Sequence, residues 1–163
     1  MASAAETEAE TQVEKVIIDG IDGFRALKGK TLGPTPPETL TQETIEQFCS
    51  AVKNYEWTHW DVERAKASHF GTTIAPGMLT PAYFPKMWFD LVDIRNIDVM
   101  LLNGSDRIRL LSPLKCGADF TMTATIRDVE DKDKGIAVHI DATFHVVGQE
   151  RPISVLSFII RYM

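Results

Sequence analysis

The segment from Met78 to Val92 is apolar on nearly every side, and it constrains the fold more than any other part of the chain. Its apolar residues are Leu79, Ala82, Tyr83, Phe84, Met87, Trp88, Phe89 and Leu91. A helix of this composition has no polar face to turn toward water, so the segment predicts a buried central helix. Pro81 falls in the first turn, where proline is tolerated, whereas Pro85 is expected to kink the helix or to end a hydrogen-bonded segment.

The second half of the chain supplies strands that can cover this helix. The predicted strands are residues 97–102, 107–111, 119–129, 135–147 and 153–162. The two long strands alternate and are rich in β-branched residues, and the charged link at residues 130–134 joins them as an antiparallel hairpin. Asn103-Gly104 is a short-turn signal between the first two strands. A buried helix followed by antiparallel strands predicts an α+β domain in which a sheet wraps around a central helix, the arrangement called the hotdog fold.

Three shorter helices are predicted before the central one. The first lies near residues 20–28. The second begins after Thr41, which can cap it, and carries an apolar stripe that ends just before Asn54. Cys49 lies on that stripe and is expected in the core. The third helix is predicted from His59 to Ala67, so Asn54 falls in the turn that follows the second helix.

The overall composition limits the classes of partner. The chain has 163 residues, which fits one domain at residues 15–163, preceded by an acidic tail at residues 1–14 that is expected to be disordered. A net charge of −6 argues against nucleic acid and against an anionic membrane as the main partner. No apolar run reaches the roughly 18 residues of a membrane span, and the N-terminus lacks the features of a signal peptide, so a cytoplasmic location is expected. Neither the two cysteines nor the four histidines have metal-ligand spacing, so no metal and no cofactor are expected.

The segment from Asn54 to Gly77 carries the candidate catalytic residues. Asn54 and His59 are five positions apart, so the chain can fold them back around one water molecule. Gly77 opens the apolar helical segment, and its backbone N–H could polarise a substrate carbonyl. Together these residues favour chemistry on water and a carbonyl compound.

Four segments between about Leu40 and the C-terminus resemble those of a known family. They are Trp57-x-His59-x-Asp61-x-Glu-Arg-Ala65, Phe70-Gly71-Thr-Thr-Ile-Ala-Pro-Gly77, Asp106-Arg-Ile-Arg109 and Ile160-Arg161-Tyr162. The first three resemble Trp-Ile-His-x-Asp-Pro-Glu-Arg-Ala, Phe-Gly-x-x-Ile-Ala-His-Gly and Asn-x-Val-Arg-Phe of the MaoC-like dehydratases, or (R)-specific enoyl-CoA hydratases. The fourth is similar to the closing residues of the same family, which includes a nodulation-protein-N-like branch.

The resemblance implies a hydro-lyase in which an aspartate and a histidine hold one water molecule. That water is added to, or removed from, the double bond of an acyl thioester. By position, His59 is the histidine and Gly77 is the donor to the thioester oxygen. Asn54 occupies the position of the aspartate and cannot take a proton at neutral pH, although its amide can still hydrogen-bond a water. Pro76 replaces the histidine that usually precedes the glycine.

Another carboxylate could stand in for the missing aspartate. The candidates are Glu56, Asp61 and Asp106. Asp106 is the most interesting of them, because the resembling segment usually has an uncharged asparagine there. Compared with the family pattern, position 54 has lost a carboxylate and position 106 has gained one, so Asp106 could supply the carboxylate from another side of the pocket. The alternative is that Asp106 is a solvated turn residue.

Four residues are predicted to contact the substrate. Tyr55, Trp57 and Trp60 could line a pocket for a flat or cyclic molecule, and packing in the core or at an interface would explain them as well. Arg107 could meet the phosphates of a coenzyme A carrier or form a surface ion pair. The partner is thus expected to be a small molecule, with a coenzyme A thioester as one form of it.

Three functions remain open from the sequence. The leading one is a lyase that adds or eliminates water on a carbonyl-activated substrate such as an enoyl or 3-hydroxyacyl thioester. Because Asn54 replaces the aspartate, a specialised metabolite is a better candidate than a simple straight-chain substrate. The alternatives are a hotdog thioesterase and a non-catalytic hotdog subunit or binding protein. A single sheet leaves an exposed edge, so a homodimer that continues the sheet is expected.

Overall fold

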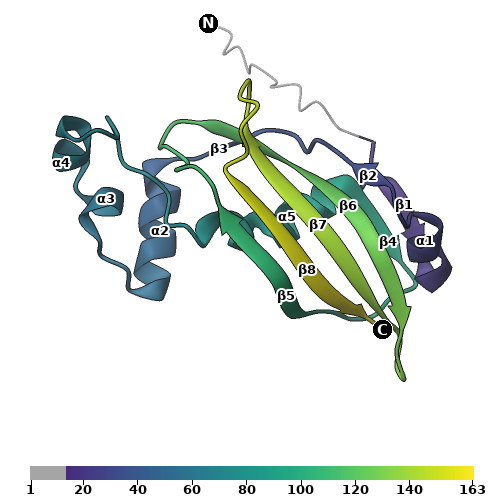
Figure 1. Cartoon of the computed structure of the whole chain (residues 1–163). Helices are drawn as coiled ribbons and strands as arrows, with labels where there is room; N and C mark the ends of the chain where they lie inside the picture. Colours follow the sequence, from purple (N-terminus) through teal and green to yellow (C-terminus); the bar gives the residue numbers. More distant parts are fainter. Residues whose placement is uncertain (1–13) are drawn as a thin grey trace, which may run out of the picture.

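Helix α5 (Leu79–Leu91) lies along one face of an antiparallel sheet, as the apolar segment predicts (Figure 1). The computed structural model describes residues 14–163, so the acidic tail predicted at residues 1–14 lies outside the described residues except for its last one. The strands of the sheet are β2 (Thr31–Leu32), β3 (Glu38–Thr39), β5 (Met100–Leu110), β6 (Asp119–Asp131), β7 (Ile136–Val146) and β8 (Ser154–Tyr162). They follow the order β2-β6-β7-β8-β5, and β3 also pairs with β6. The predicted α+β hotdog architecture is confirmed.

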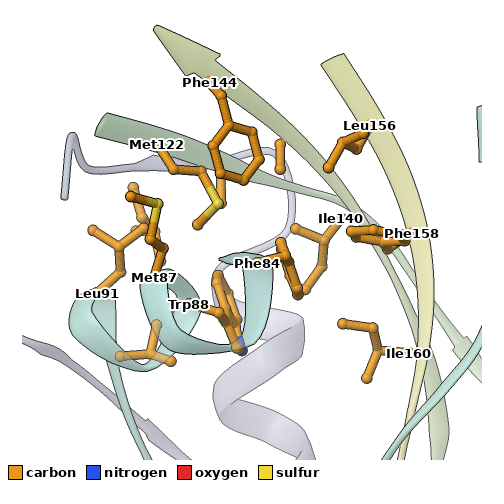
Figure 2. Packing of buried hydrophobic residues seen from close by; sticks show 14 of the residues in the cluster. Phe84, Met87, Trp88, Leu91, Met122, Ile140, Phe144, Leu156, Phe158 and Ile160 are labelled. Atoms are coloured by element: carbon orange, nitrogen blue, oxygen red, sulfur yellow. The ribbon is translucent and has the colours of Figure 1, made fainter. Parts of the chain in front are cut away.

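The hydrophobic core lies between α5 and the face of the sheet that it covers. Figure 2 shows Phe84, Met87, Trp88 and Leu91 of α5 packed among side chains of the strands. The strand residues labelled there are Met122, Ile140, Phe144, Leu156, Phe158 and Ile160. All ten side chains are buried, and each such side chain contributes about 1.5–3 kcal/mol when fully removed from water. This packing holds the start of α5 at a fixed place against the ends of β5 and β8.

Helix α5 continues through Pro85, which the sequence analysis expected to kink the helix or to end a hydrogen-bonded segment. Proline has no N–H, so the carbonyl oxygen of Pro81 receives no helical hydrogen bond from position 85. Pro85 is exposed, so its ring does not disturb the packed face of the helix. No helix within residues 14–163 is both long enough and apolar enough to cross a membrane.

The prediction of two strands joined by a turn at Asn103-Gly104 is wrong, because the structure has one edge strand there, β5. β5 runs unbroken and pairs with β8 in antiparallel register. The register shifts twice, and each shift leaves one extra residue on β5, namely Asn103 and Asp106. A turn-prone pair can remain inside a strand when the extra residue is accommodated as a bulge. The hairpin of β6 and β7, by contrast, has the predicted form.

Three of the four helices that precede α5 stand beyond one end of the sheet (Figure 1). They are α2 (Gln42–Val52), α3 (Trp57–Trp60) and α4 (Val62–Ala67). The prediction of one helix from His59 to Ala67 is wrong, because the chain breaks at Asp61. The Asp61 side chain accepts a hydrogen bond from the backbone N–H of Arg64 at 3.0 Å and so caps a separate helix, α4. This break leaves His59 on a short helix of its own.

The other end of the molecule holds a pair of strands that the sequence did not predict. β1 (Val16–Asp19) pairs in parallel with β4 (Val92–Arg95), which follows α5 directly. α1 (Gly20–Ala26) follows β1 and confirms the helix expected near residues 20–28. Both strands have only four residues and their partners are distant in sequence, so no local periodicity marks them.

Candidate active site

A pocket of about 350 Å³ lies where α3, the start of α5 and the ends of β5 and β8 meet. Its lining includes His59, residues 74–77 and Thr80. Residues 110–114 and Ile153 complete the lining. Apart from His59, Thr80 and Ser112, the side chains on its wall are aliphatic. The structure therefore brings two of the predicted catalytic residues, His59 and Gly77, to one small apolar pocket.

His59 is held in the pocket wall by its ring. Its side chain is buried, and its Nδ1 lies 2.7 Å from the backbone carbonyl oxygen of Ile74. A carbonyl oxygen can only accept a hydrogen bond, so Nδ1 carries the proton of the neutral imidazole. Nε2 is then the unprotonated nitrogen, which can accept a proton. A further bond, from the Ile74 N–H to the carbonyl oxygen of Thr58 at 3.0 Å, ties the same segment to α3.

Gly77 lies two residues before α5, at the positive end of the helix. A Cβ at position 77 would overlap the Cδ1 atom of Leu110, so any larger residue there requires the Leu110 side chain to move. Within residues 14–163 the Gly77 N–H donates to no acceptor. A donor without a partner, next to a helix N-terminus and on a pocket wall, is suited to binding an oxygen that gains negative charge.

Thr80 is a pocket residue that the sequence analysis did not single out. It is buried on the first turn of α5, and its Oγ1 accepts a hydrogen bond from the Ser154 hydroxyl at 3.0 Å. The signal that could have revealed it is its spacing of three from Gly77, which places both residues on the same side of a helix start.

Asn54 follows α2 and lies outside the pocket lining. Helix α2 is followed by its C-cap residue Lys53, which adopts a left-handed conformation with φ of 56°. The Asn54 side-chain oxygen accepts a long hydrogen bond from the Glu56 N–H at 3.4 Å. Its backbone carbonyl accepts one from Nε1 of Trp60 at 2.9 Å. Asn54 is thus joined to the helix that carries His59, but its amide is engaged in a local turn.

The three carboxylates considered as substitutes for the aspartate have other partners. Glu56 caps α3 by accepting hydrogen bonds from the Thr58 hydroxyl and backbone N–H, and these bonds lower the pKa of the Glu56 carboxyl. Asp61 caps α4. Asp106 is exposed and pairs with Arg127 at 2.9 Å. None of the three lines the pocket, and no other carboxylate within residues 14–163 does so.

Asp106 lies on the face of the sheet opposite α5. It lies beside His139 of β7. The residues before and after His139, Val138 and Ile140, are buried in the core under α5, so His139 and Asp106 lie on the opposite face. The structure does not bring Asp106 to His59, and the bulge at position 106 explains its direction. Arg107 is exposed on the same strand, also outside the pocket.

The aromatic residues proposed to contact substrate pack against one another or against charged side chains. The ring of Tyr55 lies 5.4 Å from that of Trp60, and Tyr55 is largely exposed. The guanidinium of Arg64 lies over the Trp57 ring, 4.1 Å from its centre. None of the three aromatic residues lines the pocket. Among residues 14–163, no cluster of three or more His, Cys, Asp and Glu side chains is arranged to hold a metal ion.

Comparison with known families identifies the class of protein. Residues 24–147 match the MaoC like domain, so the chain belongs to the MaoC-like dehydratase family. It is 30% identical over 146 residues to 3-hydroxyacyl-thioester dehydratase Z of Mycobacterium tuberculosis, covering 89% of this chain and 97% of that protein. It is 31% identical over 127 residues to nodulation protein N of Rhizobium leguminosarum, covering 76% of this chain and 79% of that one.

Solved structures with the same fold are more distant in sequence. A monoamine oxidase regulatory protein from Archaeoglobus superposes with a TM-score of 0.72 at 18% identity, covering 92% of this chain and 98% of that one. The unliganded R-hydratase PhaJ1 from Pseudomonas aeruginosa superposes with a TM-score of 0.67 at 16% identity, covering 82% and 80%. These similarities establish the fold, in agreement with the arrangement of α5 and the sheet.

Proposed function

We propose that this protein is a hydro-lyase that adds water to, or removes it from, an acyl thioester with a small aliphatic acyl group. One observation carries the proposal: His59, with Nε2 available as a base, and Gly77, with an unpartnered N–H, line the same pocket. The relatives named as a 3-hydroxyacyl-thioester dehydratase and an R-hydratase support the same reaction class. The aliphatic wall and the volume, near the lower end of the range for ligand pockets, favour a small acyl group.

A single acid/base group is sufficient for this reaction. In the hydration direction, Nε2 of His59 accepts a proton from water while the water oxygen bonds to C3 of an enoyl thioester. The electrons of the double bond move to the thioester oxygen, which is stabilised by the Gly77 N–H and the positive end of α5. As the enolate collapses, C2 takes the proton from the His59 imidazolium. One hydroxyl and one hydrogen are added in total, and dehydration is the reverse.

Asn54 has the role of a hydrogen-bonding group for the water in this proposal. Its side-chain oxygen has one hydrogen bond within the described part of the chain, and at 3.4 Å that bond is weak enough to give up. An amide cannot replace a general base, whose loss costs about 10²–10⁴ in rate. We therefore expect slow turnover of simple straight-chain enoyl thioesters and a more strongly activated or specialised natural substrate.

The carrier of the acyl group is expected to lie outside the pocket. Arg107 forms no ion pair within residues 14–163 and is exposed, so it stays our candidate for contact with the phosphates of coenzyme A. A thioesterase receives less support, because it requires a carboxylate near the start of α5 and none lines the pocket. A non-catalytic binding protein remains the second candidate, since the same missing carboxylate would be harmless there.

We also propose that two copies pair through β5. This strand is the edge of the sheet, and Leu101, Leu102 and Leu110 on it are each at least half exposed. An uncovered strand edge with apolar side chains is a ready site for pairing with an identical strand. Because Leu110 also lines the pocket, a second copy placed there would border the entrance to the candidate active site.

The test is hydration of a short trans-2-enoyl-CoA, followed by loss of the enoyl absorbance. The proteins to compare are the wild type, His59→Ala, Asn54→Asp and, as a control, His69→Ala. The His69 ring packs at a tilt against Phe70, outside the pocket. We expect weak wild-type activity, none in His59→Ala, a gain in Asn54→Asp and no change in His69→Ala. Release of free thiol instead of hydration would point to a thioesterase. Silence of all four proteins, with the thioester still bound, would favour the non-catalytic alternative.

A further inference from the structure

Gln42, the first residue of α2, reaches across to the backbone of the helix that carries His59. Its Nε2 donates a hydrogen bond to the carbonyl oxygen of His59 at 3.0 Å. The same Nε2 also donates to the Glu46 carboxylate at 3.0 Å, so both of its protons have acceptors. The side chain is partly buried, and it links two elements that are 17 residues apart in sequence.

The other end of the Gln42 amide is held by Thr73. The Thr73 hydroxyl donates to Oε1 of Gln42 at 2.5 Å, and Thr73 itself is fully buried. The Thr73 carbonyl accepts a hydrogen bond from the Cys116 N–H at 2.9 Å, which anchors it to the segment before β6. The carbonyl of His59 requires an N–H, so Nε2 must face His59, and Oε1 is left to accept the Thr73 hydroxyl.

These hydrogen bonds connect Gln42, Thr73 and Ile74 in a ring that includes both the backbone and the side chain of His59. Gln42 joins the His59 backbone to Thr73; the next residue, Ile74, accepts the hydrogen bond of the His59 ring. The distance between α3 and the segment at 73–74 therefore decides whether Nδ1 meets its acceptor. We infer that Gln42 and Thr73 form a clamp that positions His59 and keeps the imidazole in the tautomer with Nε2 unprotonated. The catalytic consequence rests on the proposed function, whereas the tautomer does not.

Gln47 on the same helix provides a matched control for Gln42. Gln47 donates to the Glu43 carboxylate at 3.1 Å, four residues away, in the same way that Gln42 donates to Glu46. It is exposed, and its side chain donates no hydrogen bond to residues 57–60 of α3. Changing either glutamine to glutamate creates the same pair of like charges on α2, but only Gln42→Glu removes the donor to the His59 carbonyl.

The experiment combines nitrogen NMR with kinetics on ¹⁵N-histidine-labelled protein. The variants are Gln42→Glu, Gln47→Glu, Thr73→Val and Thr73→Ser, and the His59 signals are assigned by their loss in His59→Ala. At alkaline pH, where imidazole is neutral, we expect one tautomer in the wild type, with Nε2 unprotonated. Gln42→Glu and Thr73→Val should give a mixture of tautomers, whereas Gln47→Glu and Thr73→Ser should match the wild type.

The kinetic result should follow the same pattern. Loss of the clamp misplaces the base, so kcat is expected to fall about 10- to 100-fold while KM changes by less than about threefold. A wild-type tautomer and kcat in a folded Gln42→Glu protein would overturn the inference. If Gln42→Glu fails to fold, the pair Thr73→Val and Thr73→Ser decides instead. If no hydration is detected in any protein, the proposed function has failed and the tautomer alone tests the clamp.

Discussion

Leu110 lies against Gly77 so closely that no side chain could be added at position 77 without moving Leu110. The two residues come from distant parts of the chain, the end of β5 and the start of α5, and both line the candidate active site. Gly77 does not have a positive φ, so glycine is favoured there by the space that Leu110 occupies rather than by backbone conformation. The contact brings the edge strand of the sheet to the N–H that would bind the substrate oxygen.

Gly77→Ala is expected to fold and to lose activity. Leu110 is half exposed and can rotate outward, so we expect a loss of stability toward the low end of the about 1–3 kcal/mol typical of overpacking. The displaced leucine narrows the pocket, and enoyl-CoA hydration should fall by about 10- to 100-fold. The double variant Gly77→Ala, Leu110→Ala should recover part of that loss. Independent, additive effects of the two substitutions on kcat/KM would contradict the contact's role.

Thr80→Val is expected to destabilise the start of α5. The substitution keeps the shape of the side chain but leaves the buried Ser154 hydroxyl without its acceptor, which costs about 1–3 kcal/mol. Thr80→Ser keeps the acceptor and serves as the control. Urea unfolding of the three proteins measures the difference. Equal stability of Thr80→Val and the wild type would mean that another group satisfies Ser154.

The long elements were predictable because their periodicity is local. α5 is predominantly apolar, and β6 and β7 alternate over more than ten residues each, so each element has a recognisable pattern. β5 was not predictable as one strand, because Asn103-Gly104 has the composition of a turn. Its continuity depends on pairing with β8, which lies about fifty residues further on. The parallel pair of β1 and β4 also depends on contacts between distant segments.

The candidate site was predictable only where a motif fixes the residue. His59 and Gly77 belong to segments that resemble family motifs, and the structure brings both to one pocket. Asp106 was considered for the pocket because the resembling family segment usually has an asparagine at its position, but a bulge directs it toward Arg127 on the other face of the sheet. Gln42 was not considered, because its role depends on hydrogen bonds to two segments that no sequence spacing reveals.

Leu102→Asp is expected to convert a dimer into a monomer. Leu102 lies on the edge strand β5 and is 62% exposed in a single copy, so a charge there would be buried without a partner if two copies paired. Val147→Asp is the control, because Val147 is 55% exposed but lies after β7, away from the edge. Sedimentation velocity should give a dimer for the wild type and the control and a monomer for Leu102→Asp. A dimer that survives Leu102→Asp would place the interface elsewhere.

Tyr162 is expected to limit stability at alkaline pH. Burial raises the pKa of the Tyr162 phenol well above its usual value near 10, and the hydrogen bond from Nε1 of Trp88 at 2.9 Å opposes this only in part. The unfolded chain therefore loses this proton at a lower pH than the folded chain. The stability that the folded chain gains from keeping the Tyr162 phenol protonated is fully present below about pH 10. It is lost as the pH rises further toward the pKa of Tyr162 in the folded state. Urea unfolding, followed by tryptophan fluorescence at increasing pH, should show that the free energy of unfolding begins to fall at about pH 10.

Tyr162→Phe separates the titration of the phenol from its packing. At neutral pH the variant should be less stable by about 1–3 kcal/mol, because the buried Trp88 N–H loses its acceptor. Above about pH 10 its stability should decline less steeply than that of the wild type, since position 162 no longer titrates. Tyr55→Phe, at an exposed position, should follow the wild type throughout. If Tyr162→Phe and the wild type declined in parallel, the alkaline sensitivity would have to come from another group, and Tyr83, whose pKa burial also raises, would be the next residue to substitute.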